Sequence, residues 1–340
     1  MLLFIGITYV LCFWQYTIHT TSLTYSLKIR RATNIGTAAH HGEPRALTSV
    51  TMLPIIYNRE RTIITDAQEL PTHPHPFVRP PINRKENDFL TGSILNVLYQ
   101  STYGWWAELT AGLEYEQLKG CGVPSVKYNR TGLDDMVISV GCDTLNRIEE
   151  FIKIKDIQFL CYALGGFPTR LKISECDISN TLVGTRSFAF GLGGEISGVA
   201  LDTPRHGVIV SIQARFIHFF SHHYVPVLPS NIKIMPGNLI DLLQANQYRY
   251  KNNIFEIGYN PTFVVGSGTK IGQARLSGDS FVRHSCYFNV SHLFGNPSVD
   301  PKTLLLGAGY SFAWTPTFHT KINNACLVHD KFIPDNALFF

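Results

Sequence analysis

Residues 105–116 read WWAELTAGLEYE, and apolar and polar side chains alternate along this stretch. Successive side chains of a β-strand point to opposite faces of the sheet, so their pattern has a period of two. Here Leu109 and Leu113 share one face, while Glu108, Thr110 and Glu114 share the other. A helix would spread the glutamates around its circumference. The stretch therefore predicts a strand with one apolar face.

The same alternation returns in residues 186–200, 207–220 and 302–314. In these stretches the second face is rich in Gly, Ala and Ser with few charges, which suits a narrow lumen better than a solvated surface. Charged residues make up 16% of the chain, whereas about 25% is usual for soluble domains. A transmembrane β-barrel is therefore favoured over a soluble sandwich or barrel, which would also have one apolar and one polar face.

Ten such segments lie between residues 88 and 314, and their connections are alternately short and long. The segments are expected near residues 89–100, 104–116, 135–142, 156–165, 186–200, 207–220, 240–251, 253–265, 280–292 and 302–314. Short turns on one rim and long loops on the other are typical of outer-membrane barrels. The long connections are expected at residues 117–134, 166–185, 221–239 and 266–279.

This order of connections requires one further strand at each end of the core. The candidate for the first strand is residues 46–57, where Pro54 lacks the N–H group that a paired strand needs. The last strand is expected near the C-terminus. The sequence thus predicts an all-β fold, an antiparallel up-and-down transmembrane β-barrel of about twelve strands, with about ten or about fourteen as alternatives.

Strand parity assigns side chains to the two faces of the barrel wall. The side chains expected to face the lumen are Glu108, Thr110, Glu114, Glu195, Gln213, Arg215 and Glu256. Those expected to face lipid are Leu109, Leu113, Phe188, Phe190, Leu192, Val210, Ile212, Leu306, Tyr310 and Phe312. Three tryptophans at strand ends are expected at the membrane–water interface, where an aromatic ring holds its polar tip at headgroup level: Trp105, Trp106 and Trp314.

Residues 1–22 are expected to form a signal peptide, because residues 2–14 are an apolar run that is too short for a spanning helix. An uncleaved anchor and a misplaced start codon are the alternatives. Residues 23–87 contain the candidate first strand and a Pro- and His-rich loop at residues 67–87, whose composition cannot pack a core. Residues 88–340 are expected to form the barrel core and its terminal strand.

Six of the seven cysteines follow the expected signal peptide, and an oxidising compartment permits disulfides between them. Cys121 and Cys176 lie in or beside long connections and are the candidate pair. Cys142, Cys161 and Cys286 lie inside expected strands, where they are expected to act as small apolar side chains. The sequence has no Cys/His spacing typical of zinc sites, so we expect no metal.

The chain ends in Asn-Ala-Leu-Phe-Phe at residues 336–340. Earlier stretches in barrel style read GLGGE at 191–195, FEIGYN at 255–260 and LGAGYSF at 306–312. With this pattern, the chain resembles bacterial outer-membrane β-barrel proteins of the porin-like superfamily. The resemblance implies a location in the bacterial outer membrane, contact with outer-membrane lipid, and recognition of Phe340 by the barrel assembly machinery.

The sequence contains no phosphate-binding loop, no dinucleotide fingerprint, no HExxH and no GxSxG. We therefore expect no catalytic residues, no cofactor and no nucleic-acid partner. The first hypothesis is a porin-like channel for small solutes or a structural surface protein, because charge inside a barrel selects ions or locks the wall. The alternatives are an adhesin that binds a surface ligand through its long loops, and a lipid-modifying enzyme.

Overall fold

The computed structural model describes most of the chain from residue 47 onward. The described residues are 47–65, 68–70, 77–79, 82–101, 103–123, 126–143, 157–169, 187–203, 205–224, 232–266, 268–271, 274–278, 280–295, 304–314, 318–322, 325–332 and 335–339. None of them belongs to a helix with the length and apolarity that crossing a bilayer requires. The expected signal peptide and Phe340 lie outside the described residues.

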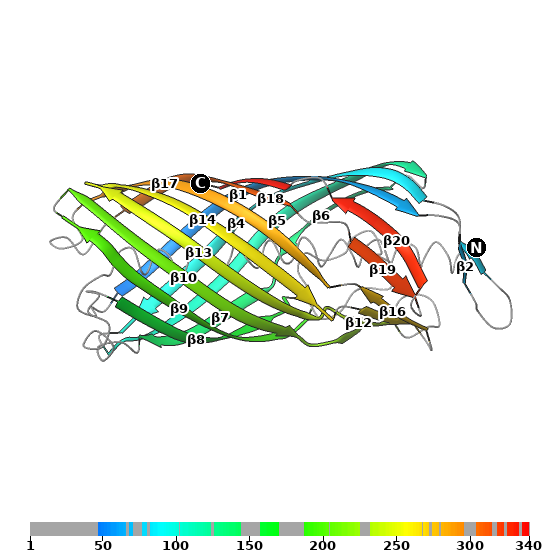
Figure 1. Ribbon diagram of the computed structural model, residues 1–340, viewed down its shortest axis with the longest axis horizontal. Helices are drawn as coiled ribbons and strands as arrows, with labels where there is room; N and C mark the ends of the chain where they lie inside the picture. Colours follow the sequence, from blue (N-terminus) through cyan, green and yellow to red (C-terminus); the bar gives the residue numbers. More distant parts are fainter. Residues whose placement is uncertain are drawn as a thin grey trace.

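Twelve antiparallel strands close into one barrel (Figure 1). In barrel order they are β1 (Leu47–Thr65), β4 (Ile82–Gln100), β5 (Trp105–Val123), β7 (Met136–Asp143), β8 (Ile157–Phe167), β9 (Ala189–Asp202), β10 (His206–Phe219), β13 (Asn238–Tyr250), β14 (Asn253–Val265), β17 (Phe281–Phe294), β18 (Leu304–Trp314) and β21 (Asp335–Phe339). β21 pairs with β18 on one side and with β1 on the other, which closes the cylinder. The predicted up-and-down barrel is confirmed.

The first strand is longer than expected and runs through Pro54 without a break. Pro54 lies opposite Ser93 of β4 in a continuous ladder. Among the described residues, β21 pairs with β1 only from Ile55 to Asn58, so no β21 residue lies opposite Pro54. A proline is tolerated where one side of its strand carries no ladder.

Several expected long loops are instead strands that continue the wall beyond the barrel (Figure 1). β5 runs to Val123 and is followed by β6 (Val126–Leu133), so residues 117–134 are mostly paired. Shorter strands occupy other long connections: β11 (His222–Tyr224), β12 (Ile232–Met235), β15 (Gly268–Ile271), β16 (Ala274–Gly278), β19 (Phe318–Ile322) and β20 (Ala325–Phe332). The loop assignment for 221–239 and 266–279 is therefore wrong in these parts, because backbone pairing continues where the apolar alternation ends.

The Pro- and His-rich segment is also more regular than expected. β2 (Gln68–Leu70) and β3 (Phe77–Arg79) form a separate two-stranded sheet, and β4 already begins at Ile82. Residues 82–87 pair with β1 on one side, and residues 83–87 pair with β5 on the other. Of the expected loop at 166–185, residues 170–185 lie outside the described residues.

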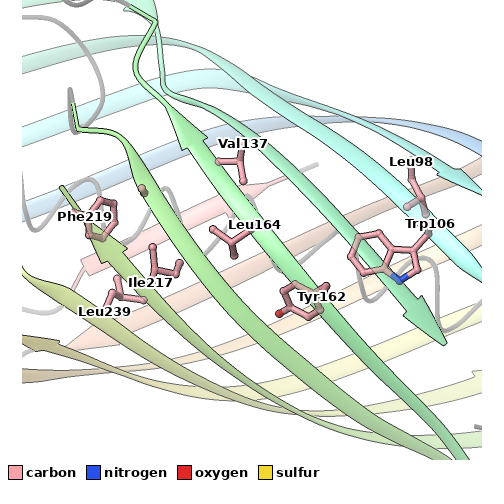
Figure 2. Close-up of a cluster of buried hydrophobic side chains, with 9 residues drawn as sticks. Leu98, Trp106, Val137, Tyr162, Leu164, Ile217, Phe219 and Leu239 are labelled. Carbon is pink, nitrogen blue, oxygen red and sulfur yellow. The ribbon is translucent and has the colours of Figure 1, made fainter. Parts of the chain in front are cut away.

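The buried apolar side chains of this protein lie inside the barrel (Figure 2). One cluster consists of Leu98, Trp106, Val137, Tyr162, Leu164, Ala189, Ile217, Phe219 and Leu239. A second cluster brings together residues of β1, β4, β13, β17 and β21: Leu53, Ile55, Tyr57, Leu90, Ile94, Leu243, Tyr287 and Ala337. The inner face is thus apolar in patches, and polar residues occupy the wall between them.

Candidate functional site in the barrel lumen

The outer face of the barrel is a continuous apolar surface. Leu113 and Ile212 are 55% and 60% exposed. The other residues expected to face lipid are also exposed, apart from Tyr310, which is half-buried beside Phe288. Soluble monomers rarely expose an apolar surface of this extent. The outer face is therefore suited to contact with lipid.

Aromatic side chains flank this surface at the end of the barrel that carries the short turns. Trp105, directly after the turn between β4 and β5, packs against Tyr99 with ring centroids 5.4 Å apart. His206, directly after the turn between β9 and β10, lies 5.2 Å from Tyr250 by ring centroids. Rings with polar tips are typical of the level at which a membrane meets water.

A matching set of rings lies at the opposite end. Trp314, the last residue of β18, stacks on His284 with ring centroids 5.3 Å apart. Phe167 ends β8 and meets Phe188 edge-on at 6.3 Å between ring centroids. An apolar band between two aromatic girdles, on a closed barrel with an even strand number, is the architecture of bacterial outer-membrane proteins.

The chain is an outer-membrane β-barrel protein. Its location is accordingly the outer membrane of a bacterial cell. No model of a protein family and no curated protein matches this outer-membrane protein.

Three solved structures illustrate the comparisons of this barrel with known folds. An outer-membrane channel from Pseudomonas putida F1 is 14% identical, with 88% of this chain and 95% of that chain covered and a TM-score of 0.47. The β domain of the Bordetella autotransporter BrkA is 9% identical, with 86% and 98% covered and a TM-score of 0.33. The outer-membrane protease OmpT from Escherichia coli is 11% identical, with 87% and 97% covered and a TM-score of 0.28. These scores are too low to argue a function from.

Trp106 does not lie at the membrane interface, contrary to expectation. It is 6% exposed and faces the lumen, whereas its neighbour Trp105 is 46% exposed on the outer face. The reason is strand parity, because adjacent residues of a strand point to opposite faces. The Trp106 ring packs against Tyr162 of β8, with ring centroids 5.6 Å apart.

The residues expected to face the lumen all lie on the inner face of the wall. Glu256 is half-buried, and the other six are at most 5% exposed: Glu108, Thr110, Glu114, Glu195, Gln213 and Arg215. Little of these side chains is accessible to water. The lumen is therefore narrow at their level.

The centre of the lumen holds a network around the carboxylate of Asp241. Arg215 of β10 forms a buried salt bridge with this carboxylate through its Nη2 atom. Asn260 Nδ2 donates a hydrogen bond to Asp241 Oδ1, and Thr262 Oγ1 donates to the same oxygen at 2.8 Å. Arg215, Asp241 and Thr262 come from neighbouring strands and share one register position.

Two further networks lie on the inner face. Asn96 Nδ2 donates hydrogen bonds to Glu108 Oε1 and, at 2.7 Å, to Thr110 Oγ1. Gln247 Nε2 donates to Glu256 Oε2 at 2.9 Å, and the Tyr287 hydroxyl donates to the other oxygen of Glu256. These bonds hold the inner side chains in defined positions.

The sequence analysis missed several of these polar residues: Asn96, Asp241, Gln247, Asn260, Thr262 and Arg283. Along β13 both faces carry apolar residues, so Asp241 does not stand out from the alternation. The signal that could have found it is strand parity, since Asp241 and Gln247 are an even number of residues apart and thus share a face.

Several buried polar atoms of the lumen are not satisfied. Among the described residues, no hydrogen-bond partner is found for Arg215 Nε and Nη1, Glu195 Oε1, Tyr162 Oη or Trp106 Nε1. Glu195 receives one weak bond, from Gln213 Nε2 to its other oxygen at 3.4 Å. Leaving a buried donor or acceptor unpaired costs about 1–3 kcal/mol. The lumen thus keeps polar groups that do not stabilise the closed wall.

The cysteines of the wall are unpaired in the described residues: Cys121, Cys142, Cys161 and Cys286. Cys176, the expected partner of Cys121, lies outside the described residues. Within the described part of the chain, no group of three or more His, Cys, Asp or Glu side chains is placed to hold a metal ion.

Proposed function

We propose that this barrel is a channel that lets small solutes cross the outer membrane. The observation that carries the proposal is the set of unsatisfied, buried polar atoms of Arg215, Glu195, Tyr162 and Trp106. Solutes and their hydration water supply hydrogen-bond partners while they pass, and so offset the desolvation of these groups.

A purely structural role for the lumen charges is the competing explanation. The salt bridge between Arg215 and Asp241 does brace β10 against β13. A half-satisfied buried network, however, is less stable than an apolar core of the same volume. A wall selected only for rigidity would not keep the Glu195 carboxylate and two N–H groups of Arg215 without partners.

The low exposure of the inner charges supports a narrow path rather than a wide pore. Glu195 and Arg215 are 1% and 2% exposed. Inner side chains therefore have to move aside when a solute passes. We expect small single-channel conductance and a strong dependence on residues of the Arg215 network.

Planar-bilayer recording of the purified, heat-modifiable protein tests this proposal. We expect discrete conductance steps, and we expect Glu195→Gln to shift the reversal potential in a salt gradient towards anions, because it removes a lumen charge. Ile196→Val is the matched control on the lipid face and should leave the reversal potential unchanged. A correctly closed barrel that passes no current at any voltage would contradict the channel.

Binding of a surface partner is the second candidate function. β1, β4 and β5 are each 19 residues long, whereas about 9–11 residues are enough to cross a membrane. Their surplus, with β6, provides an ordered surface outside the bilayer, and such surfaces commonly carry recognition. Trimming residues 117–133 should abolish partner binding and leave conductance intact if this role holds.

We do not propose an enzymatic role. His284 and His292 stack with Trp314 and Phe294. Their neighbours Ser285 and Ser291 are buried on the inner face. Adjacent residues on opposite faces of a strand do not act together on one substrate.

A further inference from the structure

We infer that the inner wall carries a helical track for neutral sugars, and this inference rests on the channel proposed above. The track is a single hydrogen-bonding row that crosses eight neighbouring strands from β5 to β17. In order, its residues are Trp106, Gly141, Tyr162, Gly193, Arg215, Asp241, Thr262 and Arg283.

The row leads from one end of the barrel to the other. Trp106 is the second residue of β5, directly after a short turn, and Arg283 is the third residue of β17, directly after a long connection. The strands are tilted against the barrel axis (Figure 1), so a row perpendicular to them winds around the lumen as it rises. A solute that follows the row therefore moves along the channel.

The first half of the row alternates aromatic residues with glycines. A Cβ atom on Gly141 would lie 2.6 Å from the Trp106 ring, and a Cβ on Gly193 would lie 2.3 Å from Cζ of Tyr162. Both rings thus lie over the backbone of the next strand, along the wall rather than across the lumen. Figure 2 shows Trp106 and Tyr162 next to each other on the inner wall.

The same half of the row presents unpaired donors. Within the described residues, Trp106 Nε1, Tyr162 Oη and two N–H groups of Arg215 have no partner, and the acceptor Glu195 Oε1 lies one register position away. Each of these side chains is more than nine-tenths buried. An aromatic surface beside unpaired donors and an acceptor matches a ring that carries hydroxyl groups, because each hydroxyl both donates and accepts.

The charges of the lumen favour a neutral solute. Arg215 is already paired with Asp241, and the fully buried acids of the inner face outnumber the buried arginines. The acids are Glu108, Glu114, Glu195 and Asp241, and the arginines are Arg215 and Arg283. An anion would be repelled by the acids, and a cation would meet only donors along the aromatic half. A sugar ring avoids both penalties and stacks its apolar C–H face on an aromatic ring.

The track is covered in the described conformation. Leu98, Val137 and Leu164 pack in the same cluster as Trp106 and Tyr162 (Figure 2). A sugar has to displace such side chains to reach the rings. Passage is therefore expected to be slow and to depend on the rings themselves.

The test is uptake into proteoliposomes of glucose, glucuronate and glucosamine, which share one ring and differ in charge. We expect glucose to enter about tenfold faster than either charged sugar, a difference that corresponds to about 1.4 kcal/mol. Trp106→Phe and Tyr162→Ala should each slow glucose uptake several-fold relative to the potassium chloride conductance of the same barrels. Trp105→Phe, the neighbour on the lipid face, should change neither quantity.

The outcomes separate this inference from the channel itself. Equal uptake of the three sugars, or unchanged glucose uptake in both lumen variants, overturns the track while measurable conductance leaves the channel standing. Absence of both current and uptake overturns both proposals. Quenching of tryptophan fluorescence by maltose in detergent, retained in Trp105→Phe and lost in Trp106→Phe, would support the track independently of transport.

Discussion

At the residue scale, two adjacent glycines of β9 have opposite tasks. Gly193 lies under the Tyr162 ring, whereas a Cβ on Gly194 would meet nothing nearer than the Leu160 carbonyl oxygen at 3.4 Å. We expect Gly193→Ala to push the Tyr162 ring into the lumen, reduce conductance, and lower the free energy of unfolding by about 1–3 kcal/mol, as overpacking does. Gly194→Ala is the matched control and should change both by much less. Urea unfolding in lipid vesicles and single-channel recording measure the two effects, and equal effects at both positions would contradict the ring placement.

At the element scale, the strand register makes a test of its own. Cys142 of β7 and Cys161 of β8 are direct cross-strand partners and both thiols are free. Directly opposed residues of antiparallel strands have Cα atoms about 4.5–5.5 Å apart, which a disulfide can bridge. A mild oxidant should therefore remove two thiols per chain in the folded barrel, counted by alkylation and mass spectrometry. Cys142→Ser should abolish this loss, and Cys286→Ser should not. Two thiols lost in Cys142→Ser as well would argue against the β7–β8 register.

The elements that sequence reasoning found are those whose two faces meet different surroundings. In β5 and β9 lipid lies on one face and a polar lumen on the other, so Leu113 and Glu195 reveal the period. In β13 the inner face includes Leu239 and Leu243, which join the buried clusters, and this apolar lumen hid Asp241 from the analysis. The short strands from β11 to β20 were missed because they pair outside the apolar band. The row from Trp106 to Arg283 depends on register between strands, which one sequence does not reveal.

At the scale of the whole molecule, closure depends on its shortest wall strand. β21 has five residues, yet it is the strand that joins β18 to β1. It also places Ala337 in the buried cluster beside β1 and β4. Without it, residues 55–58 of β1 and 309–313 of β18 would lose their ladders, and each unpaired backbone group costs several kcal/mol in hydrocarbon.

Deletion of residues 335–340 should accordingly prevent closure. We expect the shortened chain, refolded into lipid vesicles without assembly machinery, to lose the mobility shift on heating and to be digested by protease. Refolding in vitro removes the separate effect of losing Phe340 as an assembly signal. Deletion of residues 68–79 is the control, because β2 and β3 form a sheet apart from the barrel. That variant should still shift on heating, and a heat-modifiable barrel in the absence of residues 335–340 would show that β1 and β18 close the wall without β21.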